Sequence, residues 1–360
     1  MLNCFKGNYP DMEKTRVLIV DDSALVRGVI SELLSMDSSI EVVGTAVDPY
    51  DARDKIKQLK PDVLTLDIEM PKMDGITFLK NLMKLNPMPV VMLSTLTHEG
   101  ADATLQSLEI GAVDFIAKPS NTQSDELLEV FQSDLVEKVK AAASASAKLK
   151  FRRNTRNSKP KVLNKPSSVL KGRNKLIAIG SSTGGTEALH DILSVLPADM
   201  PPIVVTQHIP ASFSDRFANR LNRNCELMVK EAVHGEVLKS GNVYIAPGDT
   251  HLCIKQHGHE YVCALVDSNP VNRHKPSVEV MFNSIIDVDP KNITAIMLTG
   301  MGEDGALAMK DLVDKGAHSI VQDEASSLVW GMPGAAVRLG AAKEVVPLND
   351  IAQRLVKHLS

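Results

Sequence analysis

The chain has 360 residues, too many for one typical hydrophobic core, so we expect two domains. Its hydrophobic fraction of 44% supports well-buried interiors, and its net charge of −4 gives no global attraction to nucleic acid or to membrane surfaces. No run of about 18 apolar residues is present, so we expect no direct membrane insertion.

The N-terminus and the cysteines indicate the compartment. Residues 1–13 are polar and are interrupted by Gly7 and Pro10, so they lack the apolar run of a signal peptide. The four cysteines show no CxxC spacing, and we interpret them as reduced thiols. We therefore expect a cytoplasmic protein.

The first half of the chain alternates short apolar runs with longer amphipathic ones. We predict strands over 16–20, 40–46, 62–66, 89–93 and 114–117. We predict helices over 23–34, 49–59, 75–85, 99–110 and 125–143. Five strand–helix units of this length predict a doubly wound parallel α/β sheet in a domain spanning 14–143.

A basic connector follows over 144–174. It contains many Lys and Arg residues, Pro160 and Pro166, and no Asp or Glu. This composition is typical of a flexible linker. A solvated tether is the simpler interpretation, and a tether that also contacts an acidic partner is the alternative.

A second α/β domain is predicted over 175–360. Expected strands are 176–179, 203–206, 243–246, 252–255, 261–265, 294–298 and 319–321. Expected helices are 186–196, 213–221, 277–286, 306–315 and 350–359. The pattern again predicts a doubly wound, mostly parallel sheet.

Polar residues stand at strand ends in the first half. They are Asp21, Asp22, Asp67, Ser94 and Lys118. The carboxyl ends of parallel strands face one crevice, so these side chains should converge. Three carboxylates together favour Mg²⁺, which prefers oxygen ligands. Singly, each residue could be a helix cap, a turn residue or a surface group; the joint pattern predicts a site in which Asp67 attacks a phosphoryl donor.

This segment resembles response-regulator receiver domains over about 16–139. The matching stretches are 20–23, 66–71, 74–75 and 117–120. The resemblance implies a flavodoxin-like (βα)5 fold and phosphorylation of Asp67 by a histidine kinase. It also implies Mg²⁺ held by Asp21, Asp22 and Asp67, and phosphoryl sensing by Ser94 and Lys118.

A turn of small residues, Gly-Ser-Ser-Thr-Gly-Gly at 180–185, separates a strand from a helix. A serine there would be exposed at a helix N-terminus, which favours a nucleophile and an anionic intermediate. A plain glycine-rich turn with a serine cap is one alternative. Phosphate binding is another, but the Walker pattern needs a Lys where Thr186 and Glu187 stand.

A serine nucleophile needs a base, and the base needs an acid that orients it. His208 follows the next strand and should face the same crevice. Asp304 opens a helix after a third strand, although it could merely cap that helix. Other histidines are less well placed; His257 and His259 flank Gly258 in an expected hairpin turn, and His190, His234, His251, His274 and His318 occupy no strand end.

The second half resembles the catalytic domain of chemotaxis protein-glutamate methylesterases. The matching stretches are 180–185, 206–210 and 298–305, and the receiver–linker–esterase order fits the whole chain. The family's catalytic residues fall on Ser182 as nucleophile, His208 as base and Asp304 as acid. Its backbone oxyanion donors fall on Thr183 and Met301. The family commonly has Ala before the nucleophile, where this chain has Ser181.

The resemblance implies hydrolysis of glutamate 5-O-methyl esters on methyl-accepting chemoreceptors, deamidation of receptor glutamines, and no cofactor for the esterase reaction. It also implies inhibition by the unphosphorylated receiver. Two alternatives are a receiver-controlled transcription factor and a pseudoenzyme that only docks on receptors.

Overall fold

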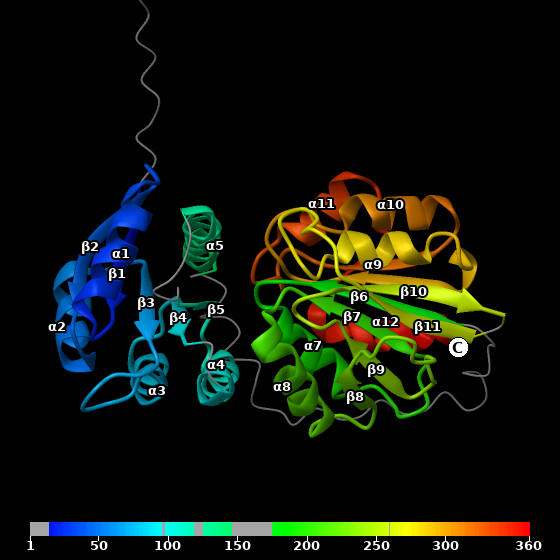
Figure 1. Cartoon of the computed structure of the whole chain (residues 1–360), viewed down its shortest axis with the longest axis horizontal. Helices are drawn as coiled ribbons and strands as arrows, with labels where there is room; N and C mark the ends of the chain where they lie inside the picture. Colours follow the sequence, from blue (N-terminus) through cyan, green and yellow to red (C-terminus); the bar gives the residue numbers. More distant parts are fainter. Residues whose placement is uncertain (1–13, 96–97, 119–124, 146–174, 259) are drawn as a thin grey trace, which may run out of the picture.

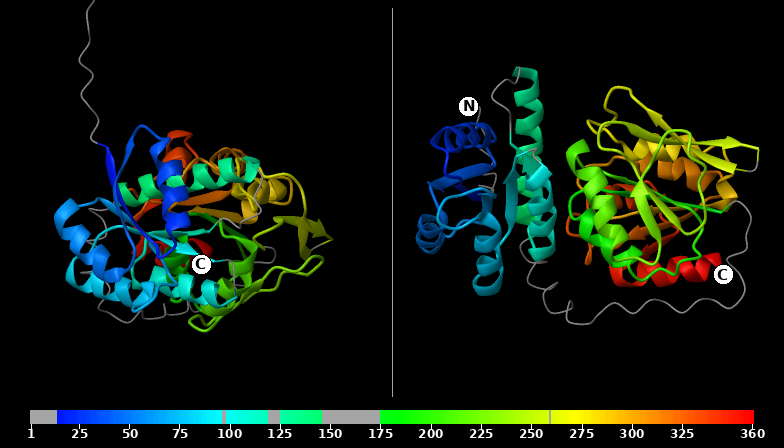
Figure 2. Two further views of the ribbon diagram at one scale, coloured as in Figure 1. Left: turned by 60° about the vertical axis from the view of Figure 1, so that its left-hand side comes forward. Right: turned by 60° about the horizontal axis from the view of Figure 1, so that its bottom comes forward.

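The computed structural model describes residues 14–95, 98–118, 125–145, 175–258 and 260–360. Two α/β domains lie side by side, and helices α4 (His98–Ile110) and α5 (Asp125–Ser144) of the N-terminal domain face the C-terminal domain (Figures 1 and 2). The predicted linker 144–174 lies outside the described residues from 146 onward. No helix among the described residues is long and apolar enough to cross a membrane.

The N-terminal domain is a five-stranded parallel sheet in the order β2-β1-β3-β4-β5. Its strands are β1 Thr15–Val20, β2 Ile40–Ala46, β3 Val63–Asp67, β4 Val90–Ser94 and β5 Asp114–Ala117. Its remaining helices are α1 Ala24–Ser35, α2 Pro49–Leu59 and α3 Gly75–Leu85. The predicted doubly wound sheet is confirmed, with the small difference that Asp67 and Ser94 are the last residues of their strands.

The C-terminal domain contains a seven-stranded sheet in the order β14-β13-β12-β6-β7-β9-β8. Every pair in it is parallel, and β10 and β11 form a separate antiparallel hairpin. The strands are β6 Leu176–Ser181, β7 Ile203–Gln207, β8 Met228–Glu231, β9 Asn242–Ile245, β10 His251–His257, β11 Glu260–Val266, β12 Ile293–Met297, β13 His318–Gln322 and β14 Glu344–Val346. The predicted mostly parallel α/β fold is confirmed. The strands on either side of the expected hairpin turn pair antiparallel, and His259 of that turn lies outside the described residues.

Helices cover both faces of this sheet (Figure 1). One layer holds α7 Gly185–Leu193, α8 Ala211–Asn222 and α12 Leu348–Leu359; the other holds α9 Val278–Ile285, α10 Ala306–Asp314 and α11 Met332–Arg338. The central strand β6 shows why both layers form: Ile177 and Ile179 enter the core under the first layer, whereas Leu176 and Ala178 enter the core under the second. A strand that is buried on both faces has a continuous apolar sequence, as β6 does.

Two strands and one α-helix of this domain were not predicted. Strand β8 carries only one fully buried residue, and β14 has three residues, so neither gives a strong apolar pattern. Helix α11 begins Met-Pro-Gly, which argues against a helix by propensity. The proline is tolerated because it occupies the first turn, where its missing N–H has no helical partner.

The two domains meet through an apolar contact flanked by ion pairs. The rings of Phe115 on β5 and Phe213 on α8 lie 4.6 Å apart between centroids. Helix α4 packs against α8 and α7. Acidic residues of α4 pair with arginines of α8, in the pairs Asp102–Arg216 and Glu109–Arg220. The C-terminal domain thus supplies the cations and the N-terminal domain the anions.

Candidate active site and phosphorylation site

The two serines of the turn after β6 lie in different environments. Ser181 is fully buried, and its hydroxyl donates a 2.7 Å hydrogen bond to the side-chain oxygen of Gln207. The amide of Gln207 in turn donates to the Ser182 carbonyl at 3.0 Å. Ser182 is only half-buried, and its hydroxyl faces His208. Ser181 therefore fixes the turn, whereas Ser182 is available for reaction.

His208 links Ser182 to Asp304. Its Nδ1 lies 3.1 Å from the Ser182 hydroxyl, and its Nε2 lies 2.9 Å from a carboxylate oxygen of Asp304. Proton transfer from Ser182 requires the tautomer in which Nε2–H donates to Asp304 and Nδ1 accepts from Ser182. The two nitrogens have exchanged the roles they hold in the chymotrypsin-type triad, where Nε2 faces the serine.

Asp304 is held by a cage of donors. The Ser277 hydroxyl and the Asn272 amide donate to one carboxylate oxygen at 2.8 Å each, and the Val278 N–H donates to the other at 2.6 Å. Burial alone would raise the proton affinity of Asp304. The hydrogen bond and charge of His208, with the other donors, outweigh burial and lower its pKa to about 2. Asp304 therefore stays ionised.

The neighbouring acid, Glu303, has a different environment. Its side chain is 76% exposed and pairs with Arg338 at 2.9 Å, away from the histidine. The geometry therefore favours Asp304 over Glu303 as the carboxylate that orients His208.

Backbone N–H groups of Thr183 and Met301 flank Ser182 on its turn and on the Gly-Met-Gly loop. No described residue accepts a hydrogen bond from either group. Gly300 makes this approach possible, because a Cβ there would lie 2.8 Å from the Ser182 Cβ and 2.4 Å from the Met332 sulfur. Free donors beside a nucleophile suit an anionic tetrahedral intermediate.

Sequence reasoning missed three residues of this site. Asn272 and Ser277 hold Asp304, and the His274 ring stacks on His208 with centroids 3.7 Å apart. They come from the segment between β11 and α9, where no strand end or glycine motif marks them. By contrast, His251 is structural: it accepts from Ser277 N–H and bonds the Asn269 carbonyl.

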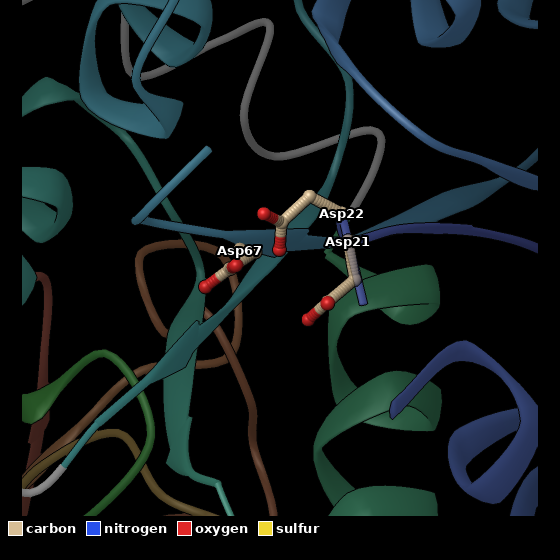
Figure 3. Close-up of side chains that lie close together, drawn as sticks. All are labelled: Asp21, Asp22 and Asp67. Atoms are coloured by element: carbon tan, nitrogen blue, oxygen red, sulfur yellow. The ribbon is translucent and has the colours of Figure 1, made fainter. Parts of the chain in front are cut away.

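The acidic cluster of the N-terminal domain forms as predicted from the strand ends. Ligand oxygens of Asp21, Asp22 and Asp67 all lie within 4.8 Å of one another (Figure 3). The Lys118 ammonium bridges Asp21 at 2.8 Å and Asp67 at 2.7 Å. Burial raises the pKa of Asp67 to about 6, although Lys118 acts in the opposite direction. Three carboxylates gathered at one place are a donor set that fits a hard divalent cation such as Mg²⁺.

Ser94 lies near this cluster but is bound to α4. Its hydroxyl contacts the Gly100 carbonyl at 3.3 Å and accepts a 2.6 Å hydrogen bond from Thr104. To bind a phosphoryl group on Asp67, Ser94 would have to leave these partners.

Comparisons with known proteins agree with this geometry. The family model described as "CheB methylesterase" matches residues 177–355, and that described as "Response regulator receiver domain" matches 17–132. A protein-glutamate methylesterase/protein-glutamine glutaminase of Hydrogenovibrio crunogenus is 50% identical over 96% of this chain and 99% of its own length. The chain belongs to the CheB family of protein-glutamate methylesterases.

Two further relatives extend this likeness. A family member of Xanthomonas campestris pv. campestris is 53% identical over 95% of this chain and 96% of its own length. The crystal structure of the Thermotoga maritima CheB methylesterase catalytic domain is 38% identical, with a TM-score of 0.50, and covers 51% of this chain and 98% of that chain. With both family models matched, this chain joins a receiver domain to a methylesterase domain.

Proposed function

We propose that this chain is a phosphorylation-activated serine hydrolase that removes methyl groups from glutamate 5-O-methyl esters of methyl-accepting chemoreceptors. The hydrogen-bonded series Ser182, His208 and Asp304 carries this proposal. Its substrates are cytoplasmic receptor helices, so we place the protein in the cytoplasm. The methylesterase match over 177–355 favours this function over that of a receiver-controlled transcription factor.

The reaction begins with attack by the Ser182 hydroxyl oxygen on the glutamyl carbonyl carbon. His208 accepts the hydroxyl proton on Nδ1, and the imidazolium is stabilised by Asp304. The oxyanion accepts hydrogen bonds from the Thr183 and Met301 N–H groups; one such donor is typically worth about 2.7–4 kcal/mol. When the intermediate collapses, His208 returns the proton to the departing methoxy oxygen and methanol leaves.

Water then completes the cycle. The oxygen of a water molecule attacks the acyl carbon while His208 accepts a proton from that water. His208 then returns the proton to the Ser182 oxygen when the carboxylic acid is released. With a glutamine side chain the first leaving group is ammonia instead of methanol. The same residues therefore support the glutaminase activity that the relatives' names record.

The receiver site supplies the control. We infer that a histidine kinase transfers its phosphoryl group to Asp67. Asp21, Asp22 and Asp67 would hold Mg²⁺, which neutralises phosphoryl oxygens when bound. Lys118 lies 2.7 Å from Asp67 and adds a fixed positive charge. The phosphoryl group carries about −1.5 to −2 charge, which replaces the single negative charge of the Asp67 carboxylate.

A physical route connects this charge to the esterase. Ser94 is held by Thr104 and Gly100 of α4, and the same helix carries Asp102 and Glu109, which pair with α8. If Ser94 turns to the phosphoryl group, α4 loses two of its contacts. The receiver also contacts the residue after the nucleophile, because the Thr183 hydroxyl bonds Asp114. We infer that the unphosphorylated receiver restricts access to Ser182 and that phosphorylation weakens this interface.

A serine-directed fluorophosphonate probe tests the proposed chemistry. With acetyl phosphate and Mg²⁺ present, the wild-type chain should be labelled and should release methanol from methylated receptor membranes. Ser182→Ala should lose both properties, whereas the matched control Ser181→Ala should keep most of them. Loss in Ser181→Ala alone would overturn the assignment of the nucleophile, and an unlabelled wild-type chain would indicate a pseudoenzyme.

A further inference from the structure

The loop between β11 and α9 places a second imidazole against the catalytic one. The His208 and His274 rings stack with centroids 3.7 Å apart and an interplanar angle of 17°. The two hydrogen bonds of His208 fix its nitrogens relative to Ser182 and Asp304. Neither hydrogen bond directly opposes a tilt of the ring about the line that joins those nitrogens. Packing against one ring face opposes this rotation.

The loop itself is rigidly held. Val271 and His274 exchange backbone hydrogen bonds of 3.0 and 2.9 Å across a two-residue turn. Both turn residues, Asn272 and Arg273, have positive φ angles of 50° and 67°. A type I′ hairpin turn needs positive φ at both positions. The turn thus directs Asn272 to Asp304 and sets His274 beside His208.

The outer side of the loop is bound to the receiver. Arg273 pairs with Glu137 at 3.0 Å and donates to the Ser133 hydroxyl at 3.1 Å, both on α5. The Arg273 side chain is 74% exposed, so this pair contributes little energy. The position of His274 is therefore set mainly by the turn and by Asn272.

We propose that His274 is a positioning residue for the reaction: its ring face holds the His208 imidazole in the orientation that passes a proton between Ser182 and the leaving group. This inference rests on the proposed role of His208 as the base. The neighbouring ring face would also favour the imidazolium that forms on His208, because a cation is attracted to an aromatic face.

The charge state of His274 fits this role. Burial, together with the charge of His208, lowers the pKa of His274 to about 3, and Arg273 and Lys138 act in the same direction. Asp304 acts the opposite way and does not outweigh them. His274 is therefore neutral in the physiological range and does not repel a protonated His208.

The test measures kcat and KM for methanol release by the full chain with acetyl phosphate, Mg²⁺ and methylated receptor membranes. His274→Ala should lower kcat about tenfold or more and change KM less than twofold. His274→Phe, which keeps a flat ring, should retain at least a third of the wild-type kcat. The acid side of the pH profile should show one titrating proton in both the wild type and His274→Phe.

A second stacked pair in the same domain provides the control. His318 and His358 stack at 3.6 Å on the β13–α12 side, so His358→Ala should leave kcat unchanged. His208→Ala separates the two claims, because an active His208→Ala would overturn the proposed mechanism itself. With His208→Ala inactive, either a normal kcat in His274→Ala or a folded His274→Phe as slow as His274→Ala would overturn the positioning role. Thermal unfolding of each variant establishes that it is folded.

Discussion

The hydroxyl of Thr183 donates a 2.5 Å hydrogen bond to the carboxylate of Asp114, although the two residues belong to different domains. Thr183 follows the proposed nucleophile, and only 5% of it is exposed. Burial raises the pKa of Asp114, and Lys138 opposes this effect from 4.0 Å. The receiver therefore holds the esterase at the turn that carries Ser182, with a contact that is shielded from water.

Removing this contact should raise the activity of the unphosphorylated chain. A buried hydrogen bond contributes about 0.5–1.5 kcal/mol net, so Asp114→Ala should increase the basal rate of methanol release about twofold to tenfold. The rate with phosphodonor should change little. Asp114→Asn is the matched control, since its amide oxygen can still accept from Thr183. An unchanged basal rate in Asp114→Ala would show that this bond does not keep the receiver against the esterase in a closed state, in which access to Ser182 is restricted.

If Asp304 and not Glu303 orients His208, substitution of these two acids should affect activity very differently. Asp304→Asn should lower kcat by several orders of magnitude, because loss of the corresponding acid in a known triad costs about 10⁴. Glu303→Gln should keep most activity, since Glu303 pairs with Arg338 at the surface. Steady-state rates on receptor membranes decide the point, and greater damage from Glu303→Gln would refute the assignment.

Asp304 should also make stability depend on pH. Its pKa falls from 3.8 to about 2 on folding, so its stabilising contribution is fully present above pH 3.8 and is lost as pH falls toward 2. The difference in unfolding free energy between the wild type and Asp304→Asn should shrink as pH falls from 3.8 toward 2. Urea unfolding across this range measures it. A difference that grows on acidification would contradict the lowered pKa.

Phosphorylation should require both Asp67 and a divalent cation. Labelling by a small phosphodonor such as acetyl phosphate should be abolished by EDTA and by Asp67→Asn, and Asp22→Ala should weaken it. Asp62, which accepts from the Arg16 N–H near the amino ends of β1 and β3, supplies the control Asp62→Asn. Phosphate incorporation measured by mass spectrometry gives the answer. Labelling that persists in Asp67→Asn would reveal a different phosphorylation site.

The sequence allowed prediction of those site residues that stand at strand ends. Parallel strands bring their carboxyl ends to the same side of a sheet, so the sequence alone groups Asp21 with Asp67 in the first domain and Ser182 with His208 in the second. His274 could not, because its position depends on a turn whose conformation only the structure shows. The Thr183–Asp114 bond was equally hidden, since it joins two domains across 69 residues.

A small change in free energy can shift the equilibrium between closed chains, in which the receiver restricts access to Ser182, and open chains, in which it does not. The Phe115–Phe213 pair is worth about 0.5–1.5 kcal/mol beyond its burial, and exposed ion pairs about 0–1 kcal/mol each. A change of about 1.4 kcal/mol shifts the closed-to-open ratio tenfold. Phosphate on Asp67 therefore needs to weaken only a few of these contacts to activate the enzyme.

The most direct measurement compares methanol release by the full chain and by the fragment 175–360 on the same methylated receptor membranes. The crystallised Thermotoga maritima catalytic domain shows that such a domain folds alone. Without phosphodonor the fragment should be clearly faster than the full chain. Acetyl phosphate with Mg²⁺ should raise the rate of the full chain and leave that of the fragment unchanged. Equal basal rates, with no response of the full chain to phosphodonor, would contradict control of Ser182 by the receiver.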